Sequence, residues 1–93
     1  QFPFSKRDYA IMIDNDVDFN SLKEKSLKIS GKLLYKIDLF DVYNGKELPK
    51  NKKSYGISFY FYNNEKTITD SEINIICNKL EKMFIDSFGA ELR

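Results

Sequence analysis

The sequence predicts an α+β domain with the element order β-α-β-β-α-β, in which a four-stranded antiparallel sheet carries two helices on one face. Segments with the period-two alternation of strands are separated by segments with the helical period of about 3.6 residues. A capping box at Thr69 and Glu72 marks one helix start, and Gly31 and Gly89 mark the helix ends. Because 93 residues suffice for one core, we expect residues 1–93 to form a single domain.

The first half of the chain predicts a strand, a helix and a second strand. Tyr9–Ile13 is apolar on both faces, which is typical of a central strand. The acidic turn after this strand ends at Asp18, whose side chain we expect to cap a helix over 19–30 by accepting a hydrogen bond from a first-turn amide. The alternation over 33–39 predicts a strand with its odd-numbered side chains buried: Leu33, Tyr35, Ile37 and Leu39.

The alternation breaks just after Leu39. If the alternation continued, Asp41 would be buried and Phe40 exposed, and removing the Asp41 carboxylate from water costs free energy. A β-bulge near Leu39–Phe40 removes this cost, because it adds one residue to the strand and re-aims the side chains after it. We therefore predict that Phe40 and Val42 turn inward, while Asp41 and Tyr43 lie on the accessible side of the sheet.

The second half of the chain predicts a hairpin, a helix and a short edge strand. Asn44–Gly45 is a turn signal, and 46–52 reads as a loop before a strand over 53–62. This strand has an apolar face for the core (Tyr55, Ile57, Phe59 and Phe61) and a small, mostly polar face left open (Ser54, Gly56, Ser58 and Tyr60). The helix after Thr69 has a buried stripe in which Cys77 is a core residue, and 90–93 is expected to form an edge strand. Together these elements predict a ferredoxin-like fold.

Composition and charge restrict the function classes. With 15 basic and 14 acidic residues, the formal net charge is +1, so the domain as a whole has no positive field that would attract polyanions non-specifically. The absence of histidine and the single cysteine exclude a structural zinc site and an internal disulfide. No apolar run reaches the ~20 residues of a membrane span, so we expect no membrane partner. Gln1 suggests a piece of a larger chain, and the cytoplasm is the expected compartment.

Other chemistries compatible with this fold lack the residues they need. Asp14, Asp16 and Asp18 match the start of a calcium loop, but Phe19 stands where glycine is required, so no metal is expected. Without histidine, no pair of nucleophile and base stands out, and no catalytic residue is expected. The stretch 53–60 partly matches an RNA recognition motif, but its aromatic residues should face the core, whereas that motif exposes them to stack bases.

The strongest candidates for ligand binding are Asp41 and Tyr43. A phenol is a stacking platform for an unpaired base, and a carboxylate accepts hydrogen bonds from base amino and imino groups. Nearby lysines such as Lys46 and Lys53 can hold phosphates. On this chemistry alone, an exposed pair without a ligand remains an open alternative.

Six spaced motifs resemble the C-terminal ferredoxin-fold anticodon-binding domain of the bacterial phenylalanyl-tRNA synthetase beta subunit. They are Phe2-Pro3 with Arg7-Asp8; Gly31-Lys32-Leu33-Leu34; Leu39-Phe40-Asp41-Val42-Tyr43 with Gly45; Pro49 with Lys52-Lys53-Ser54; Thr67-Ile68-Thr69-Asp70 with Glu72; and Phe88-Gly89-Ala90-Glu91-Leu92-Arg93. These motifs span the whole chain in the family's order, which makes the set far more specific than any one of them.

The resemblance implies tRNA recognition without chemistry in these residues. It implies a parent ligase, a heterotetramer of alpha and beta subunits, that attaches phenylalanine to its tRNA using ATP and Mg2+. In that family this domain holds the anticodon stem-loop of tRNA(Phe), so we expect no cofactor and no DNA partner for the domain itself.

The resemblance also suggests which side chains meet the RNA. Asp41 and Tyr43 correspond to the family's Asp and Tyr that meet the anticodon, and weaker RNA-binding candidates lie around them in the sequence: Ser54, Lys53, Lys46 and Arg7. The sequence leaves open whether Arg7 and Lys53 touch phosphate or pair with nearby carboxylates. The alternative function is a free-standing ferredoxin-like domain that binds a small ligand or a protein on its open sheet face.

Overall fold

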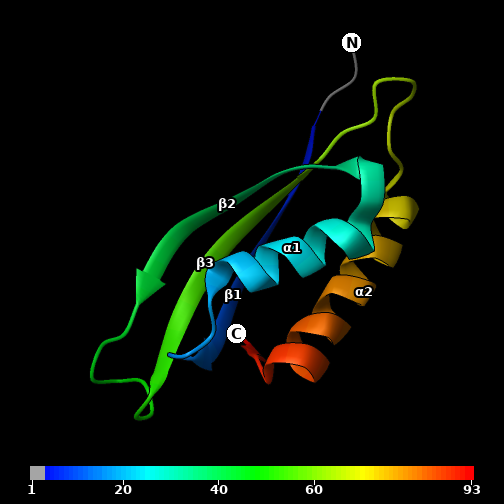
Figure 1. Ribbon diagram of the computed structural model, residues 1–93. Helices are drawn as coiled ribbons and strands as arrows, with labels where there is room; N and C mark the ends of the chain where they lie inside the picture. The colour runs from blue at the N-terminus through cyan, green and yellow to red at the C-terminus, as the bar shows by residue number, and fades with distance from the viewer. Residues whose placement is uncertain (1–3) are drawn as a thin grey trace.

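The computed structural model describes residues 4–93, so Phe2-Pro3 of the first motif lies outside the described residues. The elements are β1 (Ser5–Asp14), α1 (Phe19–Ser30), the 3-10 turn η1 (Gly31–Leu33), β2 (Leu34–Tyr43), β3 (Lys52–Phe61), α2 (Asp70–Phe88) and β4 (Glu91–Leu92). The strands form one antiparallel sheet in the order β2-β3-β1-β4. Figure 1 shows both helices on the same side of this sheet. The predicted α+β, ferredoxin-like fold is confirmed.

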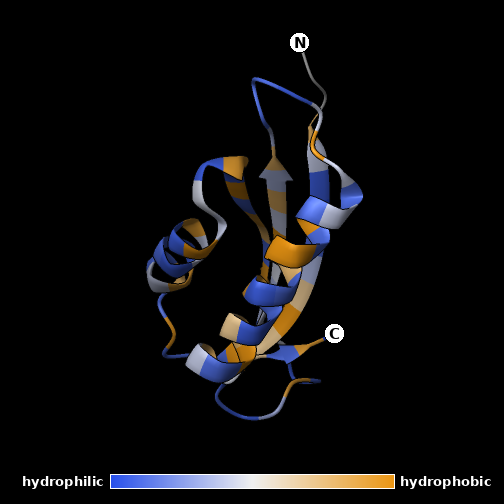
Figure 2. Ribbon diagram, turned by 90° about the vertical axis from the view of Figure 1, so that its right-hand side faces the viewer, coloured by the Kyte–Doolittle hydropathy of each residue, from blue (hydrophilic) through white to orange (hydrophobic). Residues whose placement is uncertain are grey.

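The core lies between the sheet and the helices, and its centre is the odd-numbered face of β3. Phe59 and Phe61 are fully buried, as are Ile11 and Ile13 of β1. The helices add buried side chains at helical spacing: Leu22, Ser26, Ile73, Cys77, Leu80, Met83 and Phe84. Cys77 is therefore a core residue, as predicted. In Figure 2, hydrophobic residues recur along the strands and helices, whereas the loop between β3 and α2 is mostly hydrophilic.

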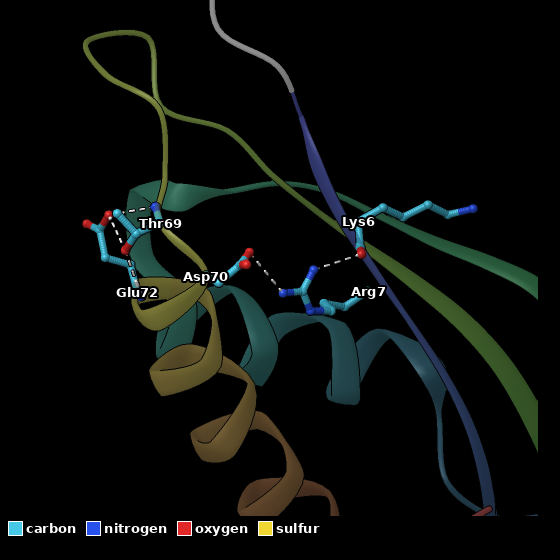
Figure 3. A network of polar contacts seen from close by, with 5 residues as sticks. All are labelled: Lys6, Arg7, Thr69, Asp70 and Glu72. Atoms are coloured by element: carbon cyan, nitrogen blue, oxygen red, sulfur yellow. Dashed lines mark hydrogen bonds and ion pairs between the residues drawn. The ribbon is translucent and has the colours of Figure 1, made fainter.

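The start of α2 is fixed by the predicted capping box. The Thr69 hydroxyl accepts a hydrogen bond from the amide of Glu72 at 3.1 Å, and the Glu72 carboxylate accepts one from the amide of Thr69 at 2.9 Å. Arg7 of β1 reaches the same helix start, where it forms an ion pair with Asp70 at 3.7 Å (Figure 3). The helix ends at Gly89, whose φ of 62° is the left-handed conformation that glycine adopts without strain.

The start of α1 differs from the prediction in one respect. Asp18 is the N-cap residue, but its side chain makes no cap hydrogen bond; its backbone carbonyl accepts one from the amide of Ser21 at 3.1 Å. The turn before the helix is held instead by Lys53, whose ammonium donates hydrogen bonds to the carbonyls of Asn15 and Val17 at 3.0 and 2.7 Å.

The start of β2 contains a bulge that the sequence pattern did not predict. The register against β3 shifts between Leu34 and Lys36, which leaves Tyr35 as the extra residue. The predicted burial of Tyr35 is wrong, because Leu34 takes the core position opposite Phe61 and the Tyr35 side chain is 62% exposed. Leu33 lies in η1 and is half-buried rather than part of the strand.

The short strand β4 lies at the edge of the sheet, as predicted. It pairs with Ile11 and Met12 of β1, and the amide of Arg93 donates a hydrogen bond to the carbonyl of Ala10 at 2.8 Å. Within residues 4–93, the edge of β1 before Ala10 has no partner strand on this side. Neither helix in this part of the chain is long and apolar enough to cross a membrane.

The capping box predicts a specific loss of stability. Thr69→Ala removes the side-chain oxygen that satisfies the Glu72 amide, and we expect the free energy of unfolding to fall by about 1 kcal/mol. The midpoint of thermal unfolding should fall by about 4–8 °C. Thr67→Ala, at an exposed threonine just before the cap, is the matched control and should leave stability within about 0.5 kcal/mol. Equal losses in the two variants would contradict the assignment of the cap.

The same box predicts a pH dependence. Hydrogen bonds from the amide and side chain of Thr69, with a contribution from Lys66, lower the pKa of Glu72 below its usual value. A lowered folded-state pKa gives stability that is present above about pH 4.3 and is lost as the pH falls through the folded-state pKa. The advantage of the wild type over Glu72→Gln in urea denaturation should therefore shrink between about pH 6 and pH 3. An advantage that stays constant over this range would contradict the prediction.

Candidate functional site

The predicted pair lies at the hairpin end of β2, on the face of the sheet that the helices leave open. A register shift makes Phe40 an extra residue of the strand, which confirms the predicted bulge. Asp41 pairs with Gly56 and Tyr43 pairs with Ser54. Because directly opposed residues of antiparallel strands point to the same face, Asp41 and Tyr43 both lie on the open face. Both are exposed, as predicted.

The predicted burial of Phe40 and Val42 is wrong, since their side chains are 57% and 58% exposed. Phe40 lies on the open face beside Asp41: a β-carbon at Gly56 would stand 2.7 Å from Cε1 of Phe40 and 3.2 Å from Cβ of Asp41. Val42 does lie opposite the buried Tyr55, on the helix side of the sheet. It remains exposed because β2 is an edge strand of the sheet, whereas Phe19 of α1 packs against Tyr55 on the inner strand β3.

The side chain of Tyr43 is held by the loop after β2. Its phenol donates a hydrogen bond to Oε2 of the Glu47 carboxylate. Its ring also lies against Gly45, where an added β-carbon would collide with the phenol oxygen. The hydrogen bond raises the pKa of Tyr43 above its usual value and lowers the pKa of Glu47. At neutral pH the donor is therefore protonated and the acceptor is ionised.

Two further candidates lie near this pair. Ser54 pairs with Tyr43 on one side and with Met12 on the other, so its hydroxyl belongs to the open face. Lys46 lies in the loop between β2 and β3, where it borders a hollow of about 310 Å³ that is shared with Asn15 and Lys50. The structure thus brings Ser54 into direct register with Tyr43 and leaves Lys46 on the adjoining loop.

The other two candidates lie on the helix side of the sheet. Lys53 has the same strand parity as the buried Tyr55, and its ammonium lies 4.8 Å from the centroid of that ring as well as on the carbonyls before α1. Arg7 pairs with the buried Phe59 in register and with Asp70 through its guanidinium. Neither side chain is brought next to Asp41 and Tyr43.

The middle of the open face is acidic. Asp8 and Asp38 both lie opposite Ser58, one on each neighbouring strand, and we call these two carboxylates the acidic row. The Ser58 hydroxyl donates a hydrogen bond to Asp8 at 2.6 Å, and Lys6 forms an ion pair with the same carboxylate at 3.7 Å. Among residues 4–93, no three acidic or thiol side chains gather closely enough to hold a metal ion.

Aromatic side chains at the far end of the open face were missed by the sequence reasoning. They are Phe4, Tyr35 and Tyr62, whose rings pack against one another. The alternation of the strands could have placed two of them. Side chains two residues apart on a strand share a face, so Tyr62 follows Tyr60, and Phe4 precedes Lys6, on the open face. The bulge that exposes Tyr35 had no such signal, since the residues around it fit a regular strand.

Comparisons with known proteins point to one family. The family described as a ferredoxin-fold anticodon binding domain matches residues 1–93. Over 93 residues, the chain is 42% identical to the phenylalanine–tRNA ligase beta subunit of Porphyromonas gingivalis and 41% identical to that of Bacteroides fragilis, and it covers 11% of each. It is 34% identical to the corresponding subunit of Clostridium tetani, of which it covers 12%.

The chain therefore spans about a tenth of the length of the curated relatives it matches. The family match, in contrast, extends over the entire chain, from residue 1 to residue 93. This complete match, together with the ferredoxin-like topology of the sheet and helices, establishes the relationship. The chain belongs to the family of ferredoxin-fold anticodon binding domains.

Proposed function

We propose that this chain is the anticodon-binding module of a phenylalanine–tRNA ligase beta subunit, and that the hairpin end of its open sheet face holds the anticodon stem-loop of tRNA(Phe). Membership of the family and the names of its relatives support tRNA as the ligand. The structural observation that supports the site best is the exposure of Asp41 and Tyr43 on the same uncovered face, two residues apart on a strand.

Each side chain has a defined role in this proposal. The ring of Tyr43 stacks on an unpaired base, and the carboxylate of Asp41 accepts hydrogen bonds from base amino or imino groups. The Ser54 hydroxyl adds a donor or acceptor beside Tyr43, and Lys46 neutralises a phosphate from the adjoining loop. For Arg7 and Lys53, which lie on the helix side, contact with RNA stays a prediction from the resemblance.

The chemistry belongs to the remainder of the parent ligase in this proposal. The beta subunit would assemble with alpha subunits in the cytoplasm, and ATP and Mg2+ would bind outside these residues. The free-standing alternative is not favoured, because the matching relatives carry this domain as about a tenth of a much longer chain.

The loop contacts of Tyr43 support binding by preorganisation. A side chain that is already fixed loses less conformational entropy when a ligand arrives, a difference of about 0.5–1.5 kcal/mol for a side chain ordered at an interface. The hydrogen bond to Glu47 and the close approach to Gly45 fix the Tyr43 ring before RNA is bound. We therefore assign Glu47 and Gly45 as positioning residues for the stacking platform.

The site assignment predicts selective loss of stem-loop binding. Tyr43→Ala should weaken binding of the tRNA(Phe) anticodon stem-loop by about 1–3 kcal/mol through lost stacking. Asp41→Ala should cost about 1.5–3 kcal/mol through lost charge-assisted hydrogen bonds. Both losses can be measured by fluorescence titration with labelled stem-loop, and an unrelated stem-loop should bind more weakly to the unmodified chain.

The control for this experiment is Asp86→Ala, which removes a carboxylate from α2 on the opposite side of the sheet and should leave affinity unchanged. Tyr43→Phe, which keeps the ring, should retain most of the stacking contribution. Equal binding of the two stem-loops, unaffected by Asp41→Ala and Tyr43→Ala, would refute the site assignment.

Preorganisation predicts an effect of Gly45→Ala. The new β-carbon would meet only the far ends of the Tyr43 and Glu47 side chains, so it should displace the phenol and leave stability within about 0.5 kcal/mol. Stem-loop affinity should fall about two- to tenfold, and Tyr43→Phe, which loses the bond to Glu47, should show part of this loss. Titration and urea denaturation of both variants provide the test. Unchanged affinity despite a shifted Tyr43 ring resonance would rule out the positioning role.

A further inference from the structure

The end of the open face away from the hairpin carries a partly exposed aromatic cluster, which we call the aromatic platform: the exposed Phe4 and Tyr35 and the half-buried Tyr62. The ring centroid of Phe4 lies 5.0 Å from that of each tyrosine, and the two tyrosine centroids are 6.2 Å apart. Phe4 is 53% exposed and Tyr35 is 62% exposed. Large aromatic side chains are stabilised by burial, and clusters of exposed rings are a common feature of binding surfaces.

The bulge at the start of β2 creates this platform. Lys36 lies on the open face and Ile37 on the core face. Without the bulge, the alternation would place Tyr35 on the core face and Leu34 on the open face. The extra residue keeps Leu34 in the core and turns Tyr35 outward, beside Phe4. Bulges of this kind re-aim side chains and are frequent next to binding sites.

Cationic side chains lie beside the platform. The ammonium groups of Lys6 and Lys36 stand 5.7 and 5.3 Å from the ring centroid of Tyr60, which occupies the neighbouring row of the open face. This row therefore carries two lysines between the aromatic rings and the acidic row: Lys36, and Lys6, which also forms the ion pair with Asp8. Such charges match the phosphodiester backbone of a nucleic acid whose bases stack on the rings.

Polar groups adjoin the platform on its other side. A hollow of about 590 Å³ is bordered by Tyr35 and Tyr62, and also by Lys32 and the amide side chains of Asn63 and Asn64. Amides can donate to and accept from the edges of unpaired bases, and Lys32 adds a further positive charge. Glu65 is the one acidic residue among the side chains that line this hollow.

We propose that the aromatic platform is a second RNA-binding site that stacks unpaired bases of a single-stranded segment with little sequence preference. Exposed rings that stack bases and flanking lysines that neutralise phosphates are the features of sites that bind single-stranded segments, and the neighbouring amides add hydrogen-bonding groups. The acidic row separates the platform from Asp41 and Tyr43, so the phosphate backbone is held at two separate contacts rather than along one continuous track. The choice of RNA as ligand rests on the proposed function.

The test uses short single-stranded oligouridylate and oligoadenylate as probes, in a Tyr43→Ala background so that the hairpin end cannot account for binding. Tyr35→Ala should weaken the binding of both oligonucleotides about 5- to 150-fold, which is the range for loss of one stacked base. Tyr35→Phe, which keeps the ring, should bind nearly as well as the background chain. Ile75→Ala is the matched control, because Ile75 is an exposed apolar residue (57%) on α2.

Lys36→Ala is a second, independent variant, which tests the platform without removing an aromatic ring. Lys36→Ala should weaken oligonucleotide binding and reduce the slope of log affinity against log salt concentration by about 0.7. Unchanged affinity in both variants, or an equal loss in Ile75→Ala, would overturn the proposal. So would a result in which Tyr35→Ala weakens only association with another protein.

The two proposals fail in distinguishable ways. If Asp41→Ala and Tyr43→Ala leave stem-loop binding unchanged while Tyr35→Ala abolishes oligonucleotide binding, the anticodon site is wrong and the platform stands. If Asp41→Ala and Tyr43→Ala weaken stem-loop binding while Tyr35→Ala leaves oligonucleotide binding unchanged, the platform is wrong and the anticodon site stands.

Discussion

Burial of one face of β3 beneath the two helices is the constraint on which the rest of the structure depends. Tyr55, Ile57 and Phe59 fill the centre of the core, and burial of each large apolar side chain contributes about 1.5–3 kcal/mol. Because strand side chains alternate, the residues between them must lie on the opposite face, where Gly56 and Ser58 are small. The absence of a side chain at Gly56 leaves room for the ring of Phe40. The packing of the core thus sets the shape of the open face.

The sequence predicted the structure correctly wherever a residue pattern is compatible with only one local conformation. The alternation of β3 left no other way to bury its aromatic residues, and Thr69 with Glu72 can satisfy each other's amides only at a helix start. The phase break after Leu39 required an extra residue, because a regular strand would have buried Asp41. The bulge and the orientation of Asp41 and Tyr43 could therefore be predicted together.

The misplaced residues have causes that lie outside the local pattern. Phe40 shares the open face with Asp41, because both residues stand opposite Gly56 at the bulge. Val42 faces the helix side but lies on the edge strand β2, and the position of a strand within the sheet does not show in its alternation. Lys53 and Ser54 are adjacent in sequence, but adjacent strand residues point to opposite faces, so Lys53 lies on the helix side and Ser54 on the open face. Proximity along a strand is thus a poor guide to a shared site.

The short length of β4 has a consequence for the protein in concentrated solution. An unpaired strand edge exposes amide and carbonyl groups that can pair with another molecule, and this is a common route to aggregation. On β1 that edge is occupied by the consecutive charges Lys6, Arg7 and Asp8, ahead of the part that β4 covers. Joining two such edges would crowd and desolvate these charges, at a cost in free energy. We therefore expect the charged run to disfavour polymerisation of the domain through its own sheet.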